Sequence, residues 1–169
     1  MTDKNGKSRV KYYIVAALII IIVALILVIP RWNAYQTQKR AEEVRAAVEA
    51  LHSYVDNFWQ TQGSAGGFDL DAALVEIGLK SKVIENWNFA IAWKSSEIYT
   101  TQMVEKLKNV NENEFVFVAP YKVIMATATA RNPVGEGRKL WFDGDNNSYH
   151  GFGADDKIEP DLGRIFPNP

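Results

Sequence analysis

The stretch YYIVAALIIIIVALILVIP, from Tyr12 to Pro30, decides the architecture of this 169-residue chain. It contains no charged residue and no Asn, Gln, Ser, Thr or Gly. At a helical rise of about 1.5 Å per residue it spans about 28 Å, close to the roughly 30 Å hydrocarbon core of a bilayer. Because a helix satisfies its backbone groups internally, residues 12–30 are predicted to form a transmembrane helix.

The flanks of this stretch predict its orientation. Residues 1–11 carry four basic residues and one acidic residue, and Tyr12, Tyr13 and Trp32 suit the two membrane interfaces. We therefore expect residues 1–11, a basic leader, to stay cytoplasmic. The folded part would then lie on the other side of the membrane, in a periplasmic or extracellular space. Two alternatives remain. A secretory signal peptide has a shorter apolar region and a small-x-small cleavage site, and a buried core helix normally keeps a polar face.

Charge and cysteine content exclude several classes of function. The chain carries a net charge of −1, so residues 31–169 must carry −4 to offset the +3 of the leader. An acidic folded part argues against a nucleic-acid-binding protein, which needs a basic surface. The chain has no cysteine. This excludes disulfides, zinc–cysteine sites, thiol catalysis and iron–sulfur clusters.

Residues 31–60 extend the helix with a different pattern. One apolar stripe recurs at intervals of three and four residues, whereas charged residues occupy the other faces. One helix from Tyr12 to about Phe58 is therefore predicted, with a kink at Pro30. The stripe suggests docking on a core, and the alternative is an anchor followed by a separate stalk. Its members are Ala41, Val44, Val48, Leu51, Val55 and Phe58.

The remaining residues, 61–169, are predicted to form a globular α+β head. Asp69 caps a short helix, Leu70–Ile77, which Gly78 ends. Residues 98–107 suit a strand or a helix equally. Turn residues at 132–137 favour a hairpin between the last two of four predicted strands. These strands are Phe89–Trp93, Glu114–Val118, Lys122–Thr129 and Arg138–Phe142.

The order of these elements resembles that of the type IV pilin and pseudopilin family. The resemblance covers residues 14–59, which begin IVAALIIIIVALILVIPRWNAYQTQKRAEEVRAAVEALHSYV. The segment YKVIMATATARNPVGEGRKLWFDGD, residues 121–145, is similar to the central hairpin of pilin heads. The resemblance implies an α+β pilin-like fold in which the long helix packs on a small antiparallel sheet.

The resemblance also implies a function: a structural or accessory subunit of a type IV pilus or a pseudopilus-type secretion system. Its partners would be the membrane and other pilin-like subunits, with Tyr13 and Pro30 as assembly residues. In the family, a prepilin peptidase cuts after a leader glycine, and a glutamate follows. By the family's spacing from Pro30, Ser8 and Tyr13 stand at these two positions. An unprocessed, anchored relative is therefore expected. The alternative is a membrane-tethered binding or sensor domain with no filament role.

The segment FDGDNNSYHGFGADDKIEPD, residues 142–161, is the main candidate for a ligand site. Calcium binds six to eight oxygen atoms, which carboxylates and amides supply. A calcium loop of EF-hand type is excluded, because Ser148 replaces the usual glycine and no glutamate stands at the twelfth position. The segment does resemble the calcium loop of major pseudopilins. The alternative is a solvated hairpin turn. The predicted calcium ligands are Asp143, Asp145, Asn147, Asp155 and Asp156.

No catalytic group is apparent in the sequence. His52 and His150 are the only histidines, and no serine–histidine–acid arrangement with a nucleophile turn can be recognised. We therefore expect no enzyme activity and no transition-metal site. Five aromatic residues are assigned to a sheet core, with an exposed ligand platform as the alternative. They are Trp87, Trp93, Trp141, Phe142 and Tyr149.

Overall fold

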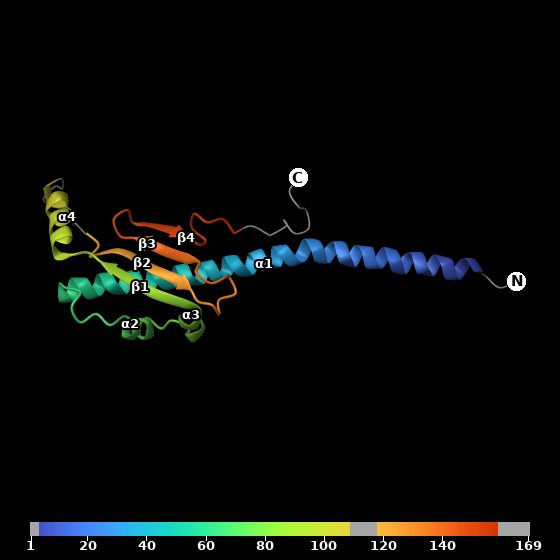
Figure 1. The fold of residues 1–169 in the computed structure, drawn as a ribbon, viewed down its shortest axis with the longest axis horizontal. Coiled ribbons are helices and arrows are strands. Elements are labelled where there is room, and N and C mark those ends of the chain that lie inside the picture. Colours follow the sequence, from blue (N-terminus) through green and yellow to red (C-terminus); the bar gives the residue numbers. More distant parts are fainter. Residues whose placement is uncertain (1–3, 109–117, 159–169) are drawn as a thin grey trace. The chain divides into compact units, whose positions relative to one another are not determined.

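The computed structural model describes residues 4–108 and 118–158 (Figure 1). The chain divides after Gln38 into two compact units, and each is described by itself. The first contains residues 4–38, and the second is Lys39–Lys157. The elements in chain order are α1 (Lys4–Gln62), α2 (Leu70–Glu76), α3 (Ser81–Asn86), β1 (Trp87–Trp93), α4 (Ser96–Lys108), β2 (Tyr121–Ala128), β3 (Lys139–Asp143) and β4 (Ser148–Gly151).

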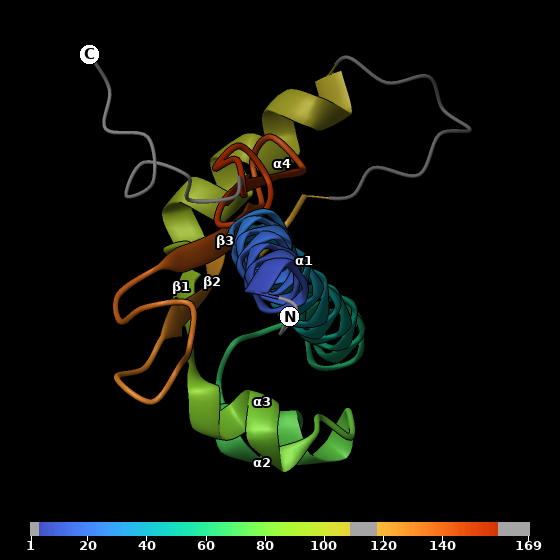
Figure 2. The ribbon, with the colours of Figure 1, turned by 90° about the vertical axis from the view of Figure 1, so that its right-hand side faces the viewer.

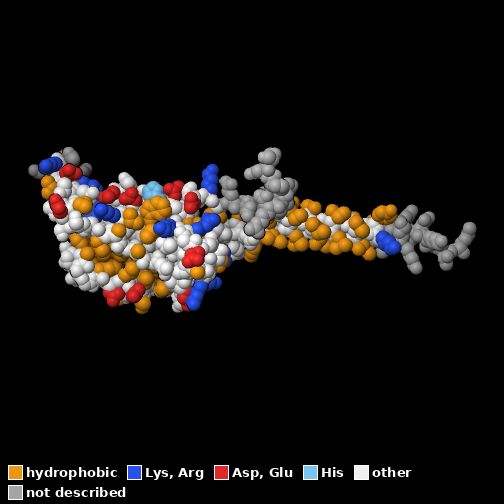
Figure 3. Space-filling view, viewed as in Figure 1, with side chains coloured by type: hydrophobic (Ala, Val, Ile, Leu, Met, Phe, Trp, Pro, Cys, Tyr) orange, Lys and Arg blue, Asp and Glu red, His pale blue; other side chains and the backbone are white. Residues whose placement is uncertain are grey.

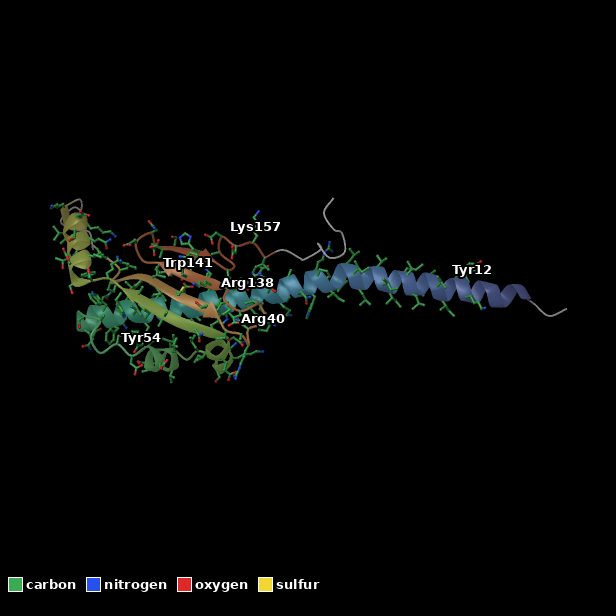
Figure 4. All side chains as sticks on the ribbon, viewed as in Figure 1. Tyr12, Arg40, Tyr54, Arg138, Trp141 and Lys157 are labelled. Atoms are coloured by element: carbon green, nitrogen blue, oxygen red, sulfur yellow. The ribbon has the colours of Figure 1, made fainter. Side chains whose placement is uncertain are left out.

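The first unit is the N-terminal part of α1. This helix extends beyond both predicted ends, from Lys4 to Gln62, and continues through Pro30. From Tyr12 to Ile29 its large apolar side chains, except Ile26, are 47–74% exposed. Figure 3 shows this apolar covering, and Figure 4 shows the Tyr12 side chain on the same helix. Because this stretch is exposed, it is not a buried core helix, and it is long and apolar enough to cross a membrane.

In the second unit, α1 forms one layer of the core. Five of the six side chains of the predicted stripe are buried, Ala47 joins them, and Phe58 is half-buried. Burial of a Val or Leu side chain contributes roughly 1.5–3 kcal/mol, so the stripe accounts for a large part of the helix–sheet adhesion. The predicted docking is therefore confirmed for this part of the helix. The buried members are Ala41, Val44, Ala47, Val48, Leu51 and Val55.

The other layer is a four-stranded antiparallel sheet in the order β1-β2-β3-β4. Figure 2 shows α1 against one face of the sheet, with α2 and α3 on the β1 side. Alternate residues of each strand face the helix, and Ile124, Leu140 and Phe142 are buried there. The opposite face carries the row Ala90, Met125, Trp141 and His150, since these residues are paired across the four strands. β1 and β4 are the edge strands.

Three strand predictions are confirmed within two residues, as β1, β2 and β3. The predicted strand Glu114–Val118 falls outside the described residues except for Val118, which is buried but not in a strand. Residues 98–107, which suited either structure, belong to helix α4. α3 and β4 were not predicted. β4 has only four residues and lies in the segment interpreted as a loop.

The short helix α2 forms as predicted. The Asp69 side chain accepts a hydrogen bond from the Ala72 N–H at 3.1 Å, which satisfies one of the free donors of the first turn. Gly78 has a φ of +71°, a conformation that glycine adopts without steric cost. The pair therefore defines both ends of the helix.

Candidate functional site

The predicted ligand segment contains the β3–β4 hairpin of the second unit. Asp143 pairs with Ser148, and residues 144–147 form the turn between them. Gly144 lies close to the start of β2. An added Cβ would be 2.5 Å from the Tyr121 carbonyl oxygen and 3.0 Å from the Ala119 Cβ. Asn147 has a φ of +51°, in the left-handed region that asparagine tolerates better than most residues. The turn is therefore fixed against the sheet.

Asp143 organises the turn from within. Its Oδ1 accepts hydrogen bonds from the backbone N–H groups of Asp145, at 2.8 Å, and Asn146, at 3.3 Å. Its Oδ2 accepts a hydrogen bond from the Asn146 side-chain amide at 2.7 Å. These bonds hold the pKa of Asp143 below its ordinary value, and the bond from the Asn146 side chain has the largest effect. Asp143 is therefore an ionised carboxylate with both oxygens occupied by protein donors.

Asp145 binds a buried lysine. Lys94 Nζ lies 2.7 Å from Asp145 Oδ1, and its side chain is only 1% exposed. Gln102, from α4, completes the triangle, since its Oε1 accepts from Lys94 at 2.8 Å and its Nε2 donates to Asp145 at 3.1 Å. A buried ammonium group must be paired, because its desolvation is costly. The turn is thus tied to α4 and to the end of β1.

A hollow of about 410 Å³ lies beside this triangle. Its wall combines the buried ion pair with apolar groups from the segment before β2. It is a concave, partly polar surface that the hairpin helps to form. The lining residues are Lys94, Gln102, Glu105, Lys106, Val118, Ala119, Gly144 and Asp145.

The C-terminal half of the hairpin holds a second network. Ser148 Oγ lies 2.9 Å from His150 Nε2, and His150 Nδ1 lies 3.0 Å from Asp155 Oδ2. Asp155 Oδ1 accepts a hydrogen bond from the Gly151 N–H. That backbone bond, followed by the bond to His150, holds the pKa of Asp155 below its ordinary value. The His150 ring stacks on Trp141 with centroids 5.7 Å apart.

The structure separates the five predicted calcium ligands. Asp143 is opposite Ser148, whereas Asp155 binds Gly151, which is opposite Leu140, three residues along β3. The positions of Asp143 and Leu140 are therefore about 10 Å apart along the strand, at roughly 3.3 Å per residue. Asp156 and Asn147 are exposed. In the range over which side chains are described, no three His, Asp or Glu side chains form a group that could hold a metal ion. Calcium binding by this loop stays a prediction.

The other predicted residues divide between the core and the surface. Trp87 and Phe142 are buried, each 4% exposed, and Trp93, Trp141 and Tyr149 are half-buried. They lie on both faces of the sheet, so the five do not form one platform. His52 packs on Phe142, with ring centroids 4.4 Å apart, and pairs with Asp56 at 3.1 Å.

Sequence reasoning missed the roles of Lys94, Ser148 and His150. The signal for Lys94 was its place directly after the apolar strand WNFAIAW, where burial is favoured. The alternation of Ser148 and His150 becomes meaningful only once β4 is known to be a strand. No family model, no curated protein and no solved structure matches this chain.

Proposed function

We propose that this chain is a pilin-like, single-pass membrane protein that serves as a structural or accessory subunit of a type IV pilus or pseudopilus-type assembly. The contrast between two parts of α1 carries the proposal. Residues 12–29 are apolar and exposed, whereas the stripe from Ala41 to Val55 is buried against an antiparallel sheet. A helix that is apolar on all sides requires lipid or other helices as its environment. This is the arrangement expected of a pilin subunit.

One face of the apolar part has the shape to receive another helix. Ile22, Leu25, Ile26, Ile29 and Pro30 line a shallow groove of about 300 Å³. Their spacing of three, one, three and one residues places them on a single helical face. Helices in membranes associate through close van der Waals packing. We therefore place the helix of a neighbouring subunit in this groove.

The basic leader and the interfacial aromatic residues support an inner-membrane location with a cytoplasmic N-terminus. The head, residues 39–157, then lies on the periplasmic or extracellular side. Ser8 and Tyr13 support an unprocessed chain that does not pass through prepilin peptidase. The intact mass of the protein from membranes tests this point. The full-length mass is expected, and a mass beginning at Arg9 would show processing.

Cysteine cross-linking tests the assembly role directly, because the chain has no cysteine of its own. Ile22→Cys and Ile29→Cys place a thiol in the groove, and Ile20→Cys and Leu27→Cys place one on the opposite side of the helix. After oxidation in native membranes, the two groove variants should form cross-linked dimers in higher yield than the two controls. Equal yields at all four positions would contradict packing through this face.

The alternative is a membrane-tethered binding domain, favoured by the 410 Å³ hollow beside Lys94 and Asp145. Exchange of residues 12–29 for an unrelated apolar helix of equal length separates the two functions. A tethered domain keeps its ligand binding and needs no particular helix. A pilin-like subunit loses its helix-dependent association with neighbouring subunits while the head stays folded.

A further inference from the structure

Ser148, His150 and Asp155 form one continuous hydrogen-bonded chain. Ser148 and His150 are two residues apart on β4, so their side chains project from the same face of the sheet. The serine oxygen contacts Nε2 of the imidazole at 2.9 Å, and the carboxylate contacts Nδ1 at 3.0 Å. This sequence of contacts is the one by which serine hydrolases activate a nucleophile.

The carboxylate fixes the protonation of the imidazole ring. Asp155 Oδ1 accepts the Gly151 N–H, and Oδ2 faces Nδ1 at 3.0 Å; an ionised carboxylate can only accept hydrogen bonds. The neutral His150 ring therefore carries its proton on Nδ1, and Nε2 is free to accept the proton of the serine hydroxyl. The stacked Trp141 ring and the Gly151 N–H hold the imidazole and the carboxylate in place. His150 is thus oriented as a general base toward Ser148.

The backbone beside Ser148 supplies a donor for a developing oxyanion. The Phe152 N–H donates to the Lys139 carbonyl at 2.8 Å, which sets the alternation of hydrogen-bonded pairs between β3 and β4. By that alternation the Tyr149 N–H points away from β3, at the open edge of the sheet. The N–H that follows the nucleophile is also the one that α/β-hydrolases use in their oxyanion hole.

We propose that Ser148 is a nucleophile and that this surface hydrolyses small activated carboxylic esters. Ser148 Oγ forms a bond to the carbonyl carbon while its proton passes to His150 Nε2. The carbonyl π electrons move to oxygen and give a tetrahedral oxyanion. This intermediate re-forms the C=O bond and breaks the bond to the ester oxygen, which takes the proton from His150 and leaves as the alcohol. Water then attacks the acyl-serine by the same route, which releases the carboxylic acid and restores the hydroxyl. The half-exposed position of Ser148 and His150 suits small substrates that need no deep pocket.

A fluorophosphonate probe tests the nucleophile on the full-length protein in maltoside detergent. The serine oxygen displaces fluoride from phosphorus, and mass spectrometry locates the label. We expect the label on Ser148 and none on the exposed Ser64. Ser148→Ala should abolish labelling, and Ser64→Ala should leave it unchanged. A label spread equally over both serines, or no label at all, would overturn the proposal.

A second measurement separates a general base from a structural histidine. His150→Ala should slow labelling at least about 100-fold, and added imidazole should restore part of the rate. His52→Gln is the matched control, because His52 also pairs with an aspartate, at 3.1 Å, and should not change the rate. Asp155 is a positioning residue. Asp155→Ala should therefore slow labelling, and Asp155→Glu, which keeps a carboxylate, should slow it less. Unchanged labelling in His150→Ala, or labelling without turnover of p-nitrophenyl acetate, would show that the network is structural only.

Discussion

The ammonium group of Lys94 is buried 2.7 Å from the carboxylate of Asp145, although Asp145 itself is 45% exposed. The two partners therefore differ in what each loses when the other is removed. Lys94 without Asp145 keeps its hydrogen bond to the Gln102 amide oxygen at 2.8 Å, but its charge stays inside the protein without this carboxylate. Asp145 without Lys94 can be hydrated. Removal of Asp145 should therefore destabilise the protein more than removal of Lys94.

Asp145→Ala is therefore expected to lower the free energy of unfolding of the head by about 2 kcal/mol, since it leaves a buried charge poorly paired. Lys94→Met should cost less, about 1 kcal/mol, because the methionine fills the same space. Denaturant unfolding followed by tryptophan fluorescence measures both values. The control is Asp156→Ala, at an exposed carboxylate, which should change stability little. A larger loss for Lys94→Met than for Asp145→Ala would contradict this account.

Gly144 is expected to tolerate no side chain. A Cβ at this position would be 2.5 Å from the Tyr121 carbonyl oxygen and 2.9 Å from the Tyr121 ring, and backbone atoms cannot move away cheaply. Gly144→Ala should therefore destabilise the head by about 3 kcal/mol, the upper end of the usual range for overpacking. Gly66→Ala is the matched control, because its Cβ would meet only the Ser64 hydroxyl at 3.5 Å. The melting temperatures of both variants, compared with wild type, provide the test.

Tyr121 should make the head sensitive to alkaline pH. Burial, and next the Asp56 carboxylate, raise the pKa of Tyr121 above its ordinary value of 10.0. The folded state therefore holds this proton more tightly than the unfolded state. The resulting stability is fully present below about pH 10 and is lost as the pH rises further.

Tyr121→Phe tests this dependence. The Tyr121 hydroxyl is buried and has no hydrogen-bond partner in the described part of the chain, so its removal at pH 7 should change stability by less than about 1 kcal/mol. Above pH 10 the variant should lose less stability than wild type. Urea unfolding at pH 7 and pH 11 measures both effects. Tyr35→Phe, at a side chain 58% exposed, should leave the wild-type pH dependence intact.

Calcium is expected to leave the melting temperature of the protein unchanged. Both oxygens of Asp143 already accept protein hydrogen bonds, and Asp145 is neutralised by Lys94. A calcium ion would have to displace these donors and draw Asp155 toward the turn. Differential scanning calorimetry with calcium and with a chelator measures the effect, since a ligand specific to the folded state must raise the melting temperature. A saturable increase that disappears in Asp143→Asn would instead show that this loop binds calcium.

Local patterns were sufficient to predict the long elements. The apolar run has the length of a membrane-spanning helix, and the stripe from Ala41 to Val55 has the helical period; both lie in α1. The strands β2 and β3 were predicted within one residue at each end, because β-branched residues in β2 and aromatic residues in β3 favour strands and a turn segment separates the two. These properties depend on residues near one another in the chain.

The hairpin site could not be predicted in the same way. Ser148 and His150 belong to a strand of four residues, too short for a period to be recognised, and the Asp-Gly and Asn-Asn pairs around it favour a loop. The partner of Asp145 is 51 residues earlier in the sequence, at Lys94. Such a pairing is set by the way β1, α4 and the hairpin pack together, which no local pattern encodes.

The position of β1 has a consequence for the behaviour of the protein in concentrated solution. This strand, WNFAIAW, is an edge strand without charge or proline, and Ala90 at its centre is exposed. The first charged group after it, on Lys94, is directed into the protein instead of guarding the edge. Native sheets normally protect such edges with charged side chains, because an open edge accepts strands from other molecules. Aggregation by strand addition at β1 is therefore the colloidal hazard of this fold, and Ala90→Lys is the substitution that would reduce it.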